Sequence, residues 1–396
     1  MAQHISDAIA LGAKVFSVYF LVISLFALAR RRAAPSAGPG RRFAVLIAAR
    51  NEESCIAGTV KSLLAQSYPA DKFTVFVLPN NCTDQTESRA RGAGAEILRM
   101  PPWVRSKGAA LTVGFRELLR DARHFDAFCV FDADNEPDPG FLAAMDASLV
   151  SARAAKSRIL SKNHESTWVS ACYEIYFCFA NRFLNRAREN LGLSARIIGT
   201  GFALRRDYLE QHPFSSETIT EDAELFAALS AHGERVAFCE RAVTYDEDPE
   251  SFAVSLTQRR RWISGIMQVA QLKMGDLLRG LRTDGAALCF DCAMQLGCGF
   301  VQALAPVGFA LSLAAAPGRV LAALPLTAAC AYLGCTATAV LSLALERRLC
   351  RGVIRGILMY PLFMLSFVPL QTLALVRKTT VWKPIAHTGA KRLAAK

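Results

Sequence analysis

The hydrophobic pattern divides the chain into a mixed central part and two strongly apolar ends. Charged and apolar positions are interspersed over residues 41–262 as in a soluble protein, whereas residues 9–29 and most of residues 286–376 are rich in Leu, Ala, Val and Phe. A helix needs about 20 apolar residues to cross the hydrocarbon core of a bilayer. The pattern therefore predicts a membrane anchor within residues 1–30 and a membrane region over residues 286–376.

The first half of the central part alternates between strand and helix patterns. Residues 43–48, 73–78 and 127–131 are short apolar runs that are typical of buried strands. Helical patterns over residues 52–66 and 109–120 precede the second and third of these runs. This alternation predicts an α/β fold with a parallel sheet.

Polar residues follow each of the three predicted strands. Asn51, Asn80 and Asp132 stand at these positions. Ligands of open α/β sheets bind beyond the carboxyl ends of the strands, so we expect these side chains to converge on one site. The domain that carries the site is expected to extend over residues 43–264.

The second half of this domain has a less regular pattern. After a turn at residues 137–140, residues 141–150 predict a helix, and residues 167–190 carry aromatic side chains at helical spacing. Such a stripe could line a groove for an acceptor, but aromatic stripes on helices usually face an interior, which favours a packed core. Small residues at 199–201 then interrupt the pattern before a strand-like run at 202–205.

The C-terminal third is apolar but does not give a simple topology. Residues 265–285 are amphipathic and basic and predict a helix in the membrane interface, and residues 286–316 and 320–345 predict two spans. A third apolar stretch, 353–376, contains two prolines, and a full crossing there would leave the basic tail at 377–396 outside the cytoplasm. We therefore expect this stretch to be re-entrant or interfacial.

The charge distribution indicates membrane and phosphate partners. The formal net charge is +12 and the pI is about 9.3, and many basic residues lie beside the apolar segments, including a linker at 31–42. Because basic residues follow the first span and none precede it, the positive-inside rule places the central domain in the cytoplasm. Anionic membrane lipids and a nucleotide diphosphate are the expected partners, and nucleic acid is not, since no nucleic-acid motif is present.

The cysteines do not predict a disulfide framework. Twelve are scattered along the chain without paired metal-ligand spacing, and the one Cys-x-x-Cys, Cys289 and Cys292, begins an apolar span. Free cysteines pack as small hydrophobic residues. We expect buried thiols in a reducing compartment.

Three polar clusters at residues 132–134, 220–222 and 258–262 carry the candidate chemistry. A metal-held sugar nucleotide needs a hard carboxylate ligand, a second carboxylate to take a proton and cations to hold the leaving diphosphate. Each cluster also has a structural explanation, namely a surface turn, an acidic helix N-terminus and a basic helix lying on lipid.

The sequences Asp-Ala-Asp, Thr-Glu-Asp and Gln-Arg-Arg-Arg-Trp, in this order and between apolar spans, resemble the membrane-bound inverting family 2 glycosyltransferases, which include cellulose, chitin and hyaluronan synthases. The resemblance covers residues 43–270 by motif and the flanking spans by arrangement. It implies a GT-A domain of the α/β class that binds a nucleotide sugar, such as a UDP-sugar, with Mg²⁺ or Mn²⁺. It also implies an integral membrane enzyme, such as one of a bacterial inner membrane.

The resemblance assigns roles to individual residues. Asp222 is the expected general base, with Glu221 and Glu224 as rivals, and Asp134 is the expected metal ligand. Arg261, with Arg259 near it, is expected to pair with the diphosphate. The nucleotide sugar is expected to contact Ala49, Asn51, Glu52, Asn80, Lys107, Asp132, Gln258 and Arg261, and the acceptor Gly199, Thr200, Gly201 and Trp262. The sequence departs from the family pattern at two positions, with Ala48 in place of a usual Pro and Asn80 in place of a frequent Asp. The second departure leaves open which nucleotide base the donor carries.

The acceptor has two interpretations. The pattern from Gln258 to Trp262 and several C-terminal spans favour a growing polysaccharide, for which accessory export subunits would be further partners. The alternative is a single transfer to a membrane lipid. A non-catalytic receptor or transporter is disfavoured because Asp134, Asp222 and Arg261 are all intact.

Overall fold

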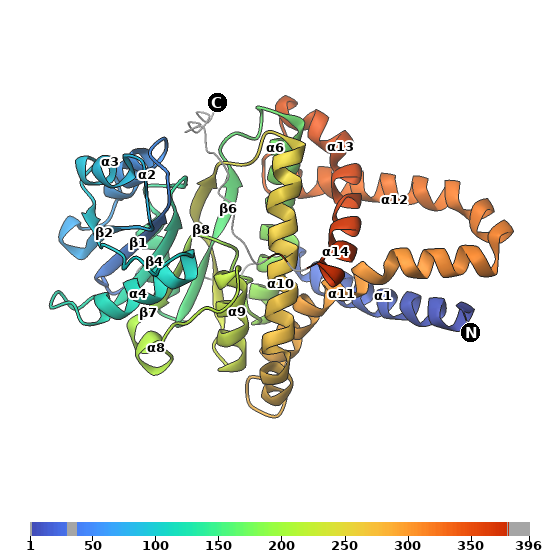
Figure 1. Cartoon of the computed structure of the whole chain (residues 1–396), viewed down its shortest axis with the longest axis horizontal. Helices are drawn as coiled ribbons and strands as arrows, with labels where there is room; N and C mark the ends of the chain where they lie inside the picture. The colour runs from blue at the N-terminus through green and yellow to red at the C-terminus, as the bar shows by residue number, and fades with distance from the viewer. Residues whose placement is uncertain (1, 30–37, 378, 380–396) are drawn as a thin grey trace.

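The computed structural model describes residues 2–29, 38–377 and 379. Most of the predicted linker at 31–42 and of the predicted basic tail at 377–396 therefore lies outside the described residues. Within them, the chain forms one α/β domain with a set of long apolar helices beside it (Figure 1).

The domain is built on a mixed sheet of eight strands, counted over the described residues, in the order β3-β2-β1-β4-β7-β6-β8-β5. Strands β3, β2, β1 and β4 are parallel, β7 is antiparallel to both of its neighbours, β6 and β8 are parallel, and β5 is antiparallel to β8. The bounds are β1 Phe43–Ala49, β2 Phe73–Pro79, β3 Glu96–Ile97, β4 Ala127–Asp132, β5 Glu136–Pro137, β6 Ala154–Ser161, β7 Phe202–Arg205 and β8 Val236–Asp246.

The expected parallel sheet is thus correct only for its first half. Strands β1, β2 and β4 are joined by short helical crossovers, which return each strand in the same direction. Strand β7 follows β6 only after a long helical excursion of about forty residues, residues 162–201, and this connection lets it enter the sheet between β4 and β6 in the opposite direction.

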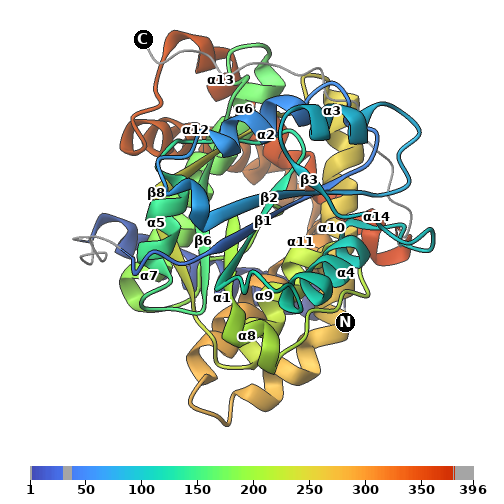
Figure 2. The ribbon, with the colours of Figure 1, turned by 90° about the vertical axis from the view of Figure 1, so that its left-hand side faces the viewer.

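Helices cover both faces of the sheet, which explains why its strands read as continuous apolar runs. On β1, Ala44 and Leu46 pack into one core with α4 and α9, whereas Val45 and Ile47 pack into a second core with α2 and α5. Figure 2 shows α2 and α3 on one side of β1 and β2 and α4 and α8 on the other. The bounds are α2 Ile56–Leu64, α3 Thr86–Gly92, α4 Lys107–Leu119, α5 Phe141–Ser148, α8 Arg206–Gln211 and α9 Glu221–Ala231.

The aromatic stretch forms helix α6 (Trp168–Phe179), a π-helical segment (Ala180–Arg186) and helix α7 (Ala187–Leu191). Thr167 begins it with a capping box, its side chain accepting a bond from the Ser170 N–H. Tyr173 and Ile175 are buried in a core shared with the apolar helices, as the aromatic stripe predicts. Tyr176 and Phe177 also line the pocket described below, so one helix serves both as core and as pocket wall.

Four helical segments in the described part of the chain are long and apolar enough to cross a membrane: Gln3–Leu28, Ala286–Ala315, Pro317–Leu345 and Arg351–Val376. Helices α1 (Ala2–Leu25), α11 (Ala286–Ala315) and α12 (Pro317–Leu345) project together away from the sheet, whereas α14 (Phe367–Val376) runs alongside α10 (Phe252–Gly280) (Figure 1). The amphipathic segment expected from residue 265 is the second half of α10, which begins at Phe252.

Both ends of the α11–α12 hairpin contact the α/β domain. Near its start, the Cys289 thiol donates to the carbonyl of Ser230 on α9 at 3.2 Å. Just after its end, the Glu346 carboxylate pairs with Arg158 and Arg182, each at 2.8 Å. The hairpin therefore leaves from the domain and returns to it.

The third apolar stretch also begins and ends against the domain. It is broken at Ser366 into α13 (Ile354–Leu365) and α14, and α13 packs on α6. Beyond α14, the Thr379 N–H donates to Ser264 Oγ on α10 at 2.8 Å. This return favours a re-entrant or interfacial placement over a full crossing, and we keep that placement as a proposal.

Candidate active site

A pocket of about 260 Å³ opens at the carboxyl ends of β1, β4 and β8, between α4, α9, α6 and α10. Of the predicted site residues, the following line it: Ala49, Glu52, Asn80, Lys107, Asp132, Asp134, Gly199, Thr200, Asp222, Gln258, Arg261 and Trp262. Parallel strands deliver residues from distant parts of the chain to one edge of a sheet, which explains this convergence.

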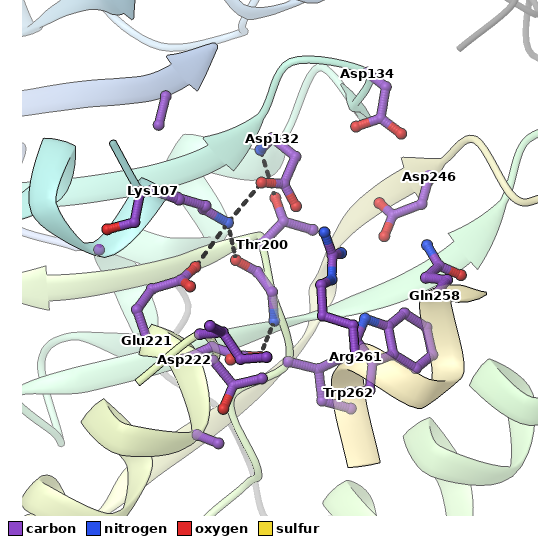
Figure 3. A pocket seen from close by; sticks show the side chains of 18 of the residues that line it. Lys107, Asp132, Asp134, Thr200, Glu221, Asp222, Asp246, Gln258, Arg261 and Trp262 are labelled. Carbon is purple, nitrogen blue, oxygen red and sulfur yellow. Dashed lines mark hydrogen bonds and ion pairs between the residues drawn. The ribbon is translucent and has the colours of Figure 1, made fainter. Parts of the chain in front are cut away.

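Lys107 links three parts of the pocket. It is the first residue of α4, whose N-terminus is capped by the Ser106 side chain. Its ammonium lies 2.5 Å from Asp132 Oδ1 and 3.2 Å from Glu221 Oε1, and it donates to the Gly199 carbonyl at 2.7 Å (Figure 3). Burial alone would lower the pKa of Lys107, but the two carboxylates outweigh burial and raise it above the usual lysine value. The side chain is therefore a fixed positive charge in the pocket.

The first turn of α9 carries the candidate base. Asp222 Oδ2 accepts the Gly199 N–H at 2.6 Å, which orients this carboxylate. Its rivals are engaged elsewhere, because Glu221 pairs with Lys107 and Glu224 accepts the N–H groups of residues 217 and 218, each at 3.0 Å. Thr220 stands at the N-cap position of α9 but makes no side-chain cap bond. Its side chain instead packs against Gly265 of α10, where the Cβ of any other residue would overlap the Thr220 side chain.

Three carboxylates face one another on the other side of the pocket: Asp132, Asp134 and Asp246 (Figure 3). Asp246 accepts a bond from Asn135 Nδ2 at 2.9 Å. Burial raises the pKa of Asp246 well above its usual value, and the negative charges of Asp134, Asp248 and Asp132 raise it further. Crowded carboxylate oxygens of this kind suit a hard divalent cation, so these residues fit Mg²⁺ or Mn²⁺.

Thr200 supports this group of carboxylates. Its hydroxyl accepts the Asp132 N–H at 3.1 Å and donates to Asn135 Oδ1. Asn135 Oδ1 also accepts the Asp132 N–H, at 2.7 Å. The side chain that was expected to contact the acceptor is therefore engaged in holding the Asp-Ala-Asp loop, although Thr200 also lines the pocket.

Helix α10 brings the third cluster into the pocket. Tyr173 donates to Gln258 Oε1 at 2.7 Å, and its ring meets Trp262 edge to face at 6.0 Å. Figure 3 shows the Arg261 guanidinium reaching toward the space between Asp132 and Asp246. An arginine at this position can fork to two phosphate oxygens.

Arg259 does not join Arg261, contrary to the expectation that both face the diphosphate. Two residues along a helix are about 200° apart, so the two side chains leave α10 on opposite faces. Arg259 is fully buried; it donates to Phe363 O at 3.0 Å and Ser366 Oγ at 2.8 Å, and its guanidinium lies 4.0 Å from the centre of the Phe363 ring. It thus holds the break between α13 and α14.

Replacing Arg259 with Met is therefore expected to destabilise the protein by about 2–3 kcal/mol through lost hydrogen bonds and cation–π contacts. Thermal unfolding of the purified protein measures this change. The matched control is Arg279→Met on the same helix, where the side chain is exposed. An equal loss in both variants would contradict a specific role for Arg259.

Two predicted residues, Asn51 and Gly201, do not line the pocket. Asn51, at φ 58°, accepts the Thr83 N–H at 2.8 Å and so ties the loops after β1 and β2 together. Gly201, at φ 61°, lies where a Cβ would overlap Ser157 Oγ, behind the pocket wall. Both lie outside the lining of this pocket, and their expected contacts with substrate stay predictions.

Several pocket residues were missed from the sequence. The acidic run Asp246-Glu247-Asp248, which begins at the last residue of β8, lines the pocket. Its signal is present in the chain, since three acidic residues follow residues 236–245, which are apolar apart from Glu240, Arg241 and Thr244, but β8 was not recognised as a strand. Arg105, Arg196 and Ile266 also line the pocket and carry no motif.

The family comparison matches this geometry. Residues 39–265 match the model of "Glycosyltransferase like family 2". The chain is a member of glycosyltransferase family 2. This assignment confirms membership of family 2 and, together with the structural comparison below, the predicted GT-A fold, while the membrane-bound and inverting character stays a prediction.

Curated relatives of this glycosyltransferase differ in what their names say they make. A probable glycosyltransferase, YdaM, of Bacillus subtilis (strain 168) is 28% identical over 57% of this chain and 55% of the relative. Cellulose synthase 2 of Novacetimonas hansenii is 25% identical over 63% of this chain and 16% of the relative. Beta-monoglucosyldiacylglycerol synthase of Synechocystis sp. (strain ATCC 27184 / PCC 6803 / Kazusa) is 24% identical over 57% and 48%. The aligned region thus spans about half of the first and third relatives.

A solved structure shares the fold along nearly the whole chain. The mannosyltransferase PcManGT from Pyrobaculum calidifontis, in complex with GDP-Man and Mn²⁺, superposes with a TM-score of 0.64 at 18% identity. The match covers 94% of this chain and 99% of that protein. At this identity the likeness concerns the fold alone.

Proposed function

We propose that this glycosyltransferase transfers a sugar, with inversion, from a nucleotide sugar to an acceptor at the surface of a membrane. The observation that carries the proposal is the pocket itself. The three facing carboxylates, the oriented Asp222 and the cations Lys107 and Arg261 meet there at the strand ends. Four apolar helices of spanning length in the described chain support attachment to a membrane.

The donor would lie along the β1, β2 and β4 loops. Glu52 and Asn80 line this end of the pocket and can contact the nucleoside, while Lys107 and Arg261 can pair with the diphosphate. Asp134, with Asp132 and Asp246, would hold Mg²⁺ or Mn²⁺, whose charge stabilises the leaving diphosphate when it is bound. The structure of PcManGT with GDP-Man and Mn²⁺ supports this use of a metal in the shared fold.

Asp222 is the proposed base. Its carboxylate would take the proton of the acceptor hydroxyl while that oxygen attacks the anomeric carbon. The carbon–diphosphate bond breaks on the opposite face, and the sugar is transferred with inverted configuration. The Gly199 N–H, which donates to Asp222, keeps the carboxylate directed at the pocket.

The acceptor side of the pocket favours a membrane lipid. Its wall contains Tyr176, Phe177, Ile198, Trp262 and Ile266, and the Tyr176 ring lies parallel to that of Phe367 on α14, 6.4 Å between centres. An apolar wall that continues into an apolar helix suits a head group joined to acyl chains. We propose a single transfer to a lipid as the better-supported activity.

A growing polysaccharide is the second candidate. It is favoured by the pattern from Gln258 to Trp262 and by relatives named cellulose synthase. A polymer channel would need helices packed around a lumen, whereas α12 leaves most of its first half exposed, including Leu321, Leu324 and Leu326. A polymer would therefore require partner subunits around this hairpin.

The test is to incubate the full chain in nanodiscs with Mn²⁺, membrane lipids and a panel of radiolabelled nucleotide sugars. We expect the label to enter the organic phase and to run as a single glycolipid. High-mass label that is insoluble in solvent would overturn the lipid acceptor in favour of the polymer. An Asp222→Asn preparation gives the background.

A further inference from the structure

A second group of potential metal ligands lies outside the active site, between the α/β domain and the loop that joins α12 to α13. His164 and Glu165 follow β6, and Cys350 follows α12. The imidazole nitrogen, carboxylate oxygen and thiol sulfur that they offer all lie within 4.8 Å of one another. None of the three residues lines the pocket.

The orientation of His164 is suited to metal binding. The side chain is buried, and Nδ1 lies 3.3 Å from the Ser161 carbonyl and 3.3 Å from Arg348 Nη2, while Arg348 Nε pairs with Glu174. In the tautomer that carries its proton on Nδ1, His164 donates to this carbonyl and keeps a lone pair on Nε2, whereas the Arg348 guanidinium, which can only donate, favours the other tautomer. Metal-bound histidines commonly donate their other nitrogen to a carbonyl in this way. Nε2 faces Glu165, 3.9 Å from Oε1.

The other two ligands are already in contact. Cys350 Sγ lies 3.2 Å from Glu165 Oε1. This approach depends on Gly352, because a Cβ there would stand 2.5 Å from Glu165 Cγ. Glu165 is exposed and Cys350 partly exposed, so solvent can reach the group and supply a further ligand.

The donor set distinguishes this group from the carboxylates of the active site. Nitrogen, sulfur and oxygen together suit zinc, whereas Mg²⁺ and Mn²⁺ prefer oxygen. Zinc–ligand bonds of about 2.0–2.3 Å require small side-chain rotations from the observed spacing. We propose that His164, Glu165 and Cys350 bind one Zn²⁺, which links the α/β domain to the α12–α13 loop.

Metal binding would strengthen a seam that is already held by ion pairs. In the same loop, Glu346 pairs with Arg158 and Arg182. Arg348, two residues later, pairs with Glu174. A zinc ion bound across the seam would resist separation of the loop from the domain. Zinc is therefore expected to raise the unfolding temperature independently of any effect on sugar transfer.

The test is zinc titration of the metal-free full chain against a chromophoric chelator, with excess Mg²⁺ present to occupy oxygen sites. We expect one equivalent to bind and to raise the thermal midpoint. Cys350→Ser and His164→Gln should each weaken binding by about tenfold or more. Cys330→Ser, which alters an exposed cysteine on α12, is the control and should behave as wild type.

Labelling of the unmodified protein keeps the test independent of variant folding. Zinc should slow the alkylation of Cys350 and leave the alkylation of Cys330 unaffected. Mass spectrometry of the peptides that contain these cysteines measures both rates. Absence of binding, wild-type zinc affinity in both Cys350→Ser and His164→Gln, or unchanged alkylation of Cys350 at saturating zinc would each overturn the proposal.

Discussion

Replacing Asp222 with Asn is expected to reduce sugar transfer by about 10²–10⁴-fold, the contribution typical of a positioned general base. Asn has nearly the shape of Asp, and its amide oxygen can still accept the Gly199 N–H that now bonds to Oδ2 at 2.6 Å. It cannot take a proton from the acceptor. The affinity for the nucleotide diphosphate should therefore stay close to wild type while turnover is lost.

Single-turnover transfer from a labelled donor and calorimetric titration with nucleotide diphosphate separate these two effects. Glu221→Gln is the informative comparison, because Glu221 lies in the same helical turn but pairs with Lys107. We expect that variant to bind donor more weakly and to keep a larger share of its turnover at saturation. Normal turnover in Asp222→Asn would remove Asp222 from the role of base.

Replacing Asp134 with Ala is expected to weaken nucleotide diphosphate binding in the presence of Mn²⁺ by about tenfold to a hundredfold, and to change it little when the metal is chelated. The reason is that Asp134 offers oxygen ligands opposite Asp132 and Asp246, so its loss removes metal affinity rather than direct contacts with the nucleotide.

Titrations with and without Mn²⁺ measure the difference. Asp71→Ala, an exposed aspartate remote from the pocket in the short helix before β2, is the matched control and should leave both affinities unchanged. Unchanged Mn²⁺-dependent binding in Asp134→Ala would move the metal to other carboxylates, with Asp246 the next to be replaced.

The parts of the site that follow recognised strands were predictable from the sequence. Asp132 lines the pocket because it ends β4, and Asn80 because it directly follows β2; apolar runs identify both strands. Asp246 was missed because β8 was not identified as a strand, so the acidic run after it had no place in the sheet. The direction of β7 depends on a long helical excursion, which local patterns do not determine.

Within motifs, sequence alone does not say which way a side chain points. Arg261 was expected to pair with the diphosphate with help from Arg259, but the turn of α10 sends Arg259 to the α13–α14 break and Arg261 to the pocket. Asn51 stands at a strand end like Asn80, yet its positive φ turns it to Thr83. These outcomes depend on three-dimensional packing that residue type and spacing do not contain.

The apolar helices hold the α/β domain at three separate elements: α9 through Cys289, the π-helical segment through Glu346, and α10 through Thr379. A body fastened at three such points has little freedom to pivot. With the chain attached to a membrane as proposed, the distance from the bilayer to the pocket would then be constant. Lipids whose reactive hydroxyl lies too near or too far from the acyl chains would be poor acceptors, even where that hydroxyl is chemically equivalent.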